Sequence, residues 1–371
     1  MDIDSSFSSL PGIAAVLARG MDEGLHIGVQ VYVWRDGKAV GDFAMGESRP
    51  GVAMTTDTLT LWMSASKPVA AVAIAQLMER GRLALDDLVA RAIPEFAEHG
   101  KEAVTIRHLL THTAGLRWVE TGWPQTPWPQ IISRICASGL EPNWTPGQRA
   151  KYDTAISWFI LGEIVRRTDG RPYPQYVREE IFEPLGMSDC WIGMPLERIA
   201  AYGDRMGVLQ VTSKPPPKPL APYDTPLAIS RCRPAANGQG TMRQLARLYQ
   251  MLLNGGHLEG ARLLSPQTVE LFITPQRIGM YDETFGHIID WGLGFLVDSK
   301  KYGYKSLPYS FGPYASPLAF GHHGFQSSMV FADPQYDLVI AIAPNGTPGE
   351  IAHDRRLREV LAAVYTDLKI A

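Results

Sequence analysis

Cysteine, long apolar runs and an excess of either charge are all scarce in this sequence. Its 371 residues include three cysteines, Cys136, Cys190 and Cys232, which form no CxxC pair and leave at least one thiol unpaired. This pattern argues against a disulfide framework and favours a reducing compartment, with each cysteine as a small core residue. No apolar run is long enough to cross a bilayer, and the acidic N-terminal segment differs from a secretory signal. A soluble cytoplasmic protein is therefore expected.

The charge balance disfavours two classes of partner. Lysine and arginine total 35 and aspartate and glutamate total 38, which gives a net charge of -3 with neutral histidines, and no block of like charges occurs. Such a chain has no basic field to attract nucleic acid or an anionic membrane. With 45% hydrophobic residues and a length that fits one or two domains, it can bury a large core.

Hydrophobic periodicity predicts sheet segments near both ends of the chain and helices between them. Helices are expected at 10–24, 66–80, 106–112, 155–168, 242–254 and 355–368, and strands at 26–34, 39–45, 292–297, 318–322, 327–331 and 338–343. The first two strands flank an Asp-Gly pair that is typical of a hairpin turn. The pattern predicts one sheet built from residues 1–75 together with 205–371, interrupted by a mostly helical domain at 76–204.

The segment SASK at 64–67 is the first that contains candidate catalytic residues. Residues three apart on a helix share a face, so the Lys67 amine would approach the Ser64 hydroxyl. A lysine can take the serine proton only if burial or a nearby charge lowers its pKa. The Ser64 amide, near a helix start, would point where an oxyanion forms. About one such spacing is expected by chance in a chain of this size, so a capping Ser64 with a surface Lys67 stays an alternative.

The segment KYDT at 151–154 lies in a loop that enters a predicted helix. Loops of this kind often present functional side chains, and a Tyr152 whose pKa is lowered by neighbouring cations can exchange protons with a serine or a leaving group. The alternative is that Tyr152 packs in the core while Asp153 or Thr154 caps the helix.

Two histidines and two glycines stand in the otherwise apolar predicted strand around FGHHGF at 320–325. His322 or His323 could donate to a substrate carbonyl or carboxylate and help to hold the pKa values of Lys67 and Tyr152 down. Glycine would let a ligand approach the backbone closely. Because side chains alternate along a strand, only one of the two histidines should face a cleft. No Asp, Glu or Cys stands at a spacing that supports a metal site.

Several other patterns are explained at least as well by packing or capping. These are the helical pair His108 and His112, the aromatic group Trp118, Trp123 and Trp128, and the Asp-Asp turn at 86–87. The aromatic group could instead wall an apolar pocket.

In their order and separations, Ser64-x-x-Lys67, Tyr152-x-Thr154 and His322-His323-Gly324 resemble the three active-site motifs of serine β-lactamase-like and penicillin-binding proteins. Segments 104–116 and 181–187 resemble the branch that contains class C β-lactamases and family VIII carboxylesterases. The likeness spans roughly residues 10–361. It implies an α+β fold in which an antiparallel sheet is flanked by helices, an all-helical domain is inserted, and the active site lies in the cleft between them. Segments 215–222 and 302–314 would form the rim.

The resemblance implies that Ser64 is the acylated nucleophile, that Lys67 and Tyr152 share the acid and base duties, and that the Ser64 and Phe325 amides form the oxyanion hole. Thr154, His322, His323 and Gly324 would contact the substrate. His322 stands where penicillin-recognising members usually have lysine, and Thr154 replaces the common asparagine. Losing a lysine that could pair with a carboxylate favours ester over lactam hydrolysis.

The predicted function is therefore hydrolysis of a small-molecule carboxylic ester through a Ser64 acyl-enzyme, with no cofactor or metal implied. Acyl transfer to an acceptor, or hydrolysis of an amide, a D-peptide or a β-lactam, would use the same residues. A catalytically silent binding module is the alternative of a different class.

Overall fold

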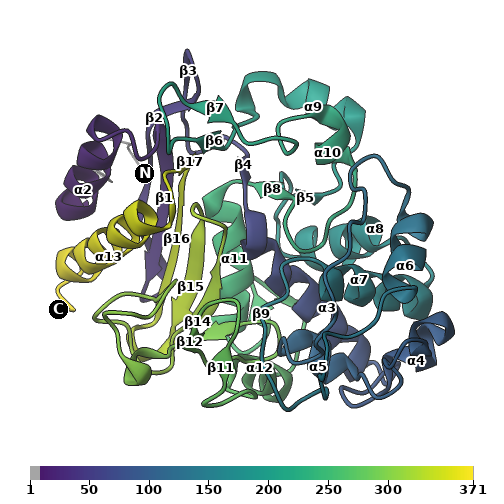
Figure 1. Ribbon diagram of the computed structural model, residues 1–371. Coiled ribbons are helices and arrows are strands. Elements are labelled where there is room, and N and C mark those ends of the chain that lie inside the picture. The colour runs from purple at the N-terminus through teal and green to yellow at the C-terminus, as the bar shows by residue number, and fades with distance from the viewer. Residues whose placement is uncertain (1–8, 371) are drawn as a thin grey trace.

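The computed structural model describes residues 9–370, which form a sheet beside a mostly helical region (Figure 1). The helices are α2 (Pro11–Asp22), α3 (Lys67–Glu79), α4 (Val89–Ala92), α5 (Ile106–Leu110), α6 (Trp128–Cys136), α7 (Ile156–Asp169), α8 (Tyr173–Val177), α9 (Leu196–Tyr202), α10 (Pro226–Ser230), α11 (Met242–Leu253), α12 (Pro266–Ile273) and α13 (Glu350–Asp367). Each helix predicted from periodicity is present, within a few residues at its ends except that α13 begins five residues before the expected start.

The central sheet has seven strands in the order β13-β14-β15-β16-β1-β2-β3, and its neighbours are antiparallel. They are β1 (Gly28–Arg35), β2 (Lys38–Arg49), β3 (Val52–Ala53), β13 (Leu296–Val297), β14 (Phe320–His323), β15 (Met329–Asp333) and β16 (Leu338–Pro344). β1 pairs with β16 from Val29↔Pro344 to Arg35↔Leu338. Purple β1 and yellow-green β16 accordingly lie side by side (Figure 1). The prediction of one antiparallel sheet built from both ends of the chain is confirmed.

Backbone conformation explains where the first hairpin turns and why the strand expected at 292–297 is shorter than predicted. Asp36 and Gly37 both have positive φ, 50° and 78°, as the tight turn between β1 and β2 requires. The strand expected at 292–297 is wrong in extent, because only Leu296–Val297 pairs with β14. Gly294 has φ 82° and forms a bend before it.

Helices cover both faces of the sheet. α2 and α13 pack against each other on one face, where Ile13, Leu17 and Leu357 are buried together with the sheet residues Val31 and Ile340. α11 contacts β15 and β16 from the opposite side. α3 lies beyond it in the helical region, and its residues from 67 to 77 are all buried. The prediction of a buried helix from its run of Ala, Val, Ile and Leu is therefore confirmed.

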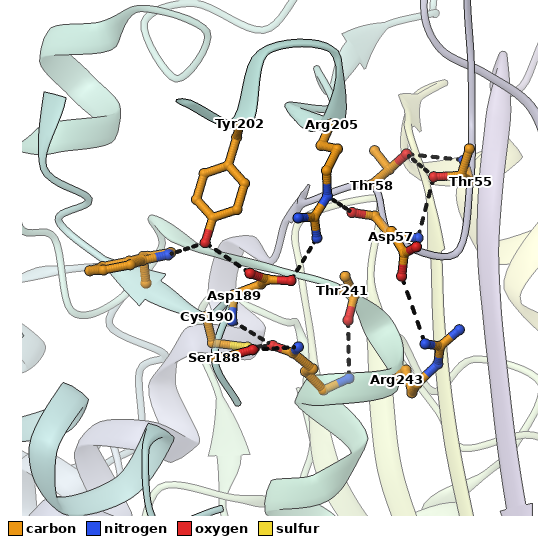
Figure 2. A network of polar contacts seen from close by, with 12 residues as sticks. Thr55, Asp57, Thr58, Ser188, Asp189, Cys190, Tyr202, Arg205, Thr241 and Arg243 are labelled. Atoms are coloured by element: carbon orange, nitrogen blue, oxygen red, sulfur yellow. Dashed lines mark hydrogen bonds and ion pairs between the residues drawn. The ribbon is translucent and has the colours of Figure 1, made fainter. Parts of the chain in front are cut away.

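A polar network fixes the chain just before β4 (Thr60–Leu61), which pairs with β8 (Gly238–Gly240) beside β5 (Trp191–Ile192). Figure 2 shows Arg205 between two partners, donating to the Asp57 carbonyl oxygen at 3.0 Å and pairing with the Asp189 carboxylate at 2.6 Å. Arg243 of α11 lies 3.7 Å from the Asp57 carboxylate. Three segments far apart in the sequence are thereby held together where the chain enters β4.

The structure also bears on the expected absence of membrane-spanning segments and on the three cysteines. Within residues 9–370, no helix is both long and apolar enough to cross a membrane. Cys136 and Cys190 are buried, as predicted, whereas Cys232 is half-buried, and all three thiols are free. The division into a sheet domain and an inserted domain at 76–204 stays a prediction.

Candidate active site

Ser64 and Lys67 meet at the junction of a 3₁₀ turn (Met63–Ser66) and α3. Lys67 is fully buried, and its Nζ lies 3.0 Å from the Ser64 Oγ. The same nitrogen donates to the carbonyl oxygens of Thr154 at 3.1 Å and Ala235 at 3.2 Å. The spacing of three residues thus brings the amine to the hydroxyl, and the alternative of a surface Lys67 is wrong.

The surroundings of Lys67 favour its neutral form. Burial lowers the pKa of Lys67 well below its ordinary value, and the positive charge of Arg233 lowers it further, while the Asp153 carboxylate opposes the shift. A neutral amine has two N–H donors and one lone pair. Because two carbonyl oxygens take the donors, the lone pair is left to face the Ser64 hydroxyl.

Tyr152 lies in the loop before α7, with its backbone and its ring both fixed. Its amide donates to Asp282 Oδ1 at 3.0 Å. Its ring packs against His112, with centroids 4.6 Å apart, and against Trp291 at 5.6 Å. The Lys67 Nζ lies 5.2 Å from the centre of the Tyr152 ring. The second motif is therefore brought against the first.

The protonation of Tyr152 differs from the sequence-based expectation. Burial raises the pKa of Tyr152 above its ordinary value, a hydrogen bond with Ser64 opposes this, and Asp153 and Asp282 raise it further. The expectation that neighbouring cations lower this pKa is wrong, because desolvation dominates. Tyr152 is consequently a phenol that can donate a proton.

Asp153 and Thr154 serve the site through their positions. The Asp153 carboxylate accepts hydrogen bonds from the amides of Ala155, Ile156 and Ser157, each at 2.8 Å, and so caps α7 as the structural alternative predicts. Thr154 is exposed and lines the pocket described below. Its carbonyl oxygen, which belongs to the backbone and leaves no trace in the motif, holds Lys67.

His322 and His323 point to opposite faces of β14, as alternation predicts, yet both line the pocket. His322 lies 6.1 Å from Tyr152 between ring centroids, whereas His323 stacks on Phe311 at 5.4 Å. β13 pairs with β14 only at Phe320 and Gly321, so the pocket can reach both faces of the strand end beyond them. The expectation that only one histidine faces the cleft is therefore wrong.

Both histidines are neutral groups here. Burial lowers the pKa of His322 well below its ordinary value. Burial also lowers the pKa of His323, to about 3. A neutral His322 carries no charge with which to hold down the pKa of Lys67 or Tyr152, so that expectation is wrong as well.

Gly324 is required by the protein's own backbone. Its amide donates to the Ser328 carbonyl oxygen at 2.7 Å, and a Cβ at this position would overlap the Ser328 side chain and the Trp62 carbonyl oxygen. The space of the missing side chain is therefore filled by Ser328 and by the segment that precedes Ser64. Contact of Gly324 with a substrate stays a prediction. The close approach places Phe325 at the pocket beside Ser64.

Two backbone amides near Ser64 are available to a ligand. The Phe325 amide donates to no acceptor within residues 9–370, and Ser64 is the second residue of its 3₁₀ turn, so the turn contains no acceptor for its amide. Met63 and Gln326, which flank them, adopt positive φ values of 50° and 42°. Such conformations cost about 1–3 kcal/mol each and cluster at functional sites.

Arg356 of α13 anchors the loop that carries Phe325. Its buried guanidinium donates to the carbonyl oxygens of Leu25 at 2.9 Å, Gln326 at 2.9 Å and Gly346 at 3.1 Å. Burial lowers the pKa of Arg356 to about 9. No motif points to this residue, because its three acceptors are backbone atoms from distant parts of the chain.

These groups open onto a pocket of about 520 Å³. Its wall includes Ser64, Tyr152 and Phe325, and also Tyr309 from the predicted rim segment 302–314. The other predicted rim segment, 215–222, does not line it, although the next residue, Tyr223, does.

The helical pair His108 and His112 accepts hydrogen bonds from backbone amides. His108 lies at the start of α5, where its Nδ1 accepts from the Thr105 amide. His112 is buried under Tyr152 and accepts from the Asp153 amide at 2.9 Å, a role that the sequence analysis missed. Within the described part of the chain, no group of three or more His, Cys, Asp or Glu residues is placed to hold a metal ion.

A sequence model of the β-lactamase family matches residues 13–364. The chain belongs to the β-lactamase family. It is thus a serine hydrolase, and the resemblance inferred from the three motifs is confirmed.

Solved structures and curated relatives agree with this membership. A penicillin-binding protein homologue from Caulobacter crescentus is 30% identical, with 96% of this chain and 97% of that chain covered and a TM-score of 0.78. A family VIII carboxylesterase is 27% identical, covers 97% of both chains and has a TM-score of 0.79. The esterase/β-lactamase LipL of Mycobacterium tuberculosis is 25% identical over 341 residues, which are 84% of this chain and 76% of the relative. The predicted fold class is therefore confirmed.

Proposed function

We propose that this protein hydrolyses a carboxylic ester of a small molecule through an acyl-enzyme on Ser64. The observation that carries the proposal is the 3.0 Å contact between Ser64 Oγ and a buried Lys67 whose two other hydrogen bonds go to carbonyl oxygens. A predicted cytoplasmic location and a small-molecule partner belong to the same proposal.

In the first step, neutral Lys67 takes the Ser64 proton while the hydroxyl oxygen attacks the ester carbonyl carbon. The amides of Ser64 and Phe325 donate to the oxyanion that forms. As the carbon–oxygen bond to the alcohol breaks, Tyr152 gives its proton to the leaving oxygen and regains one from protonated Lys67. Water then attacks the acyl carbon, with the amine and the phenol returning the protons in reverse, and frees Ser64.

Two observations favour an ester over a β-lactam. Where penicillin-recognising members have a lysine, this chain has His322, and burial lowers its pKa so that no cation stands at that position. A family VIII carboxylesterase is similar over 97% of this chain. Ester hydrolysis requires no carboxylate contact at His322.

The test is intact-mass spectrometry and nitrophenol release with p-nitrophenyl esters of increasing chain length, and with a β-lactam, for wild type, Ser64→Ala and Ser133→Ala. Ser133 is exposed on α6 and serves as the matched control. We expect an acyl adduct and turnover in wild type and Ser133→Ala, and neither in Ser64→Ala. Turnover that persists in Ser64→Ala, or a wild type without adduct or turnover, would contradict the proposal, and faster release on adding an alcohol would show an acyltransferase.

A further inference from the structure

Arg233 is a cation on the pocket wall that has no anionic partner. Its side chain lines the pocket together with Ser64 and Tyr152. Within residues 9–370, its guanidinium forms no ion pair and donates no hydrogen bond, and its Nε is shielded from solvent. A shielded donor of this kind is costly to leave without an acceptor.

Two aromatic rings and the backbone hold Arg233 in place. Its guanidinium carbon lies 4.9 Å from the centre of the Trp123 ring and 5.6 Å from that of Tyr223. Its amide donates to Asn237 Oδ1 at 2.8 Å. Two residues further on, the Ala235 carbonyl oxygen accepts from Lys67. The cation is therefore pre-oriented by stacking, on the same loop that holds the proposed base.

Glu350, the other charged residue that lines this pocket, already accepts hydrogen bonds from two side chains. The carboxylate of Glu350 accepts from Gln326 Nε2 at 2.9 Å and from the Tyr309 hydroxyl at 3.2 Å. The positive charge of Arg233, in contrast, is close enough to lower the pKa of Lys67. The two terminal Nη groups of Arg233 have no acceptor among residues 9–370 and, unlike Nε, are not among the shielded atoms. A bound carboxylate could accept from both in the planar, two-pronged geometry that guanidinium groups prefer.

We propose that Arg233 binds a carboxylate of the substrate, so that the preferred esters are anionic. This inference rests on the proposed esterase function and names its substrate class. The carboxylate can belong to the acyl part, as in the monoester of a dicarboxylic acid, or to the alcohol part. The chemistry recognised is the same, and the test distinguishes the two positions.

The experiment compares two pairs of substrates that differ by a carboxylate. The first pair is the p-nitrophenyl monoester of glutaric acid and p-nitrophenyl pentanoate, and the second is a nitrophenyl butanoate with a ring carboxylate and its uncharged parent. For each pair we measure the ratio of kcat/KM values, anionic over neutral, in wild type, Arg233→Met, Arg233→Lys and Arg231→Met. Arg231 is exposed on the same loop and is the matched control. The ratio cancels any common effect of a variant on Lys67 or on folding.

We expect Arg233→Met to lower the ratio about 10- to 100-fold for one pair, the size of a hydrogen-bonded charge contact, with a smaller fall in Arg233→Lys and none in Arg231→Met. The affected pair identifies the position of the carboxylate. Ratios that Arg233→Met leaves unchanged in both pairs would overturn the proposal.

If no ester is turned over, the proposed function fails but the proposal about Arg233 is still decided. Calorimetry then measures glutarate binding to Ser64→Ala and to Ser64→Ala with Arg233→Met. Binding that disappears with Arg233 supports the anion site, and binding that is absent or equal in both overturns it.

Discussion

Asp282→Ala should destabilise the fold, because it breaks a buried ion pair with Arg277. The side chains of Arg277 and Asp282 are 1% and 0% exposed, and Arg277 Nη1 lies 3.0 Å from Asp282 Oδ2. The other oxygen, Oδ1, accepts from the amides of Tyr152 and Thr284, each at 3.0 Å, and Phe285 at 3.2 Å. Asp282→Ala would leave a buried cation without its carboxylate and three amides without their acceptor.

Removing one partner of a buried ion pair costs about 3–5 kcal/mol. An unfolding entropy of about 2.1 cal/mol/K per residue gives roughly 0.8 kcal/mol/K for a chain of this length. The melting temperature should therefore fall by about 4–6 °C. Burial already lowers the pKa of Arg277 to about 10 against the attraction of Asp282, so the variant lowers it further. Because a cation with a lowered folded pKa costs stability below that pKa, the deficit should shrink as pH rises through it.

Thermal unfolding followed by circular dichroism, at neutral pH and near pH 10, measures these quantities. A double variant, Arg277→Met with Asp282→Asn, removes both charges and should recover most of the lost stability at neutral pH. A single variant that melts within about 1 °C of wild type, or a double variant no more stable than the single one, would refute the reasoning.

Two further predictions follow from the site. The kcat/KM of the wild type should rise with pH as Lys67 loses its proton. Arg233→Met should move this rising part of the pH profile to higher pH, because it removes a charge that lowers the pKa of Lys67. A profile that Arg233→Met leaves in place would contradict this. Arg356→Met should lower kcat about 10- to 100-fold with little change in KM, because the substitution loosens the loop of Phe325. Arg356→Lys should keep part of the kcat that Arg356→Met loses. Steady-state kinetics that show a change in KM alone would count against the anchoring role.

Much of the fold and part of the site could be predicted from the sequence, because the signals are local or depend on order along the chain. The helical spacing of Ser64 and Lys67 predicts that the two side chains meet. The composition of the Asp36–Gly37 pair predicts the hairpin turn. The alternation of β14 correctly separates His322 from His323. Each of these inferences needs only neighbours within a few residues.

The rest depends on contacts between distant segments. Arg233 stands out only through its contacts with two aromatic rings and its place on the pocket wall. Arg356 stands out only through its hydrogen bonds to three backbone oxygens, which no sequence pattern reveals. The direction of the Tyr152 pKa shift was missed because desolvation depends on how completely other segments cover the ring. The packing of Gly324 was missed because part of the space beside it is filled by Trp62 and Met63, which come some 260 positions earlier.

The pairing of β1 with β16 also has a consequence for biosynthesis. Val29 is translated 315 positions before its partner Pro344, an interval of roughly 15–60 s at ordinary elongation rates. During that time β2 can pair with one edge of β1, while the other edge presents unpaired N–H and C=O groups. The 3₁₀ turn of Ser64 and the helix α3 are thus complete on the ribosome well before the sheet and the loop of Phe325. The emerging chain carries an open strand edge for most of its synthesis.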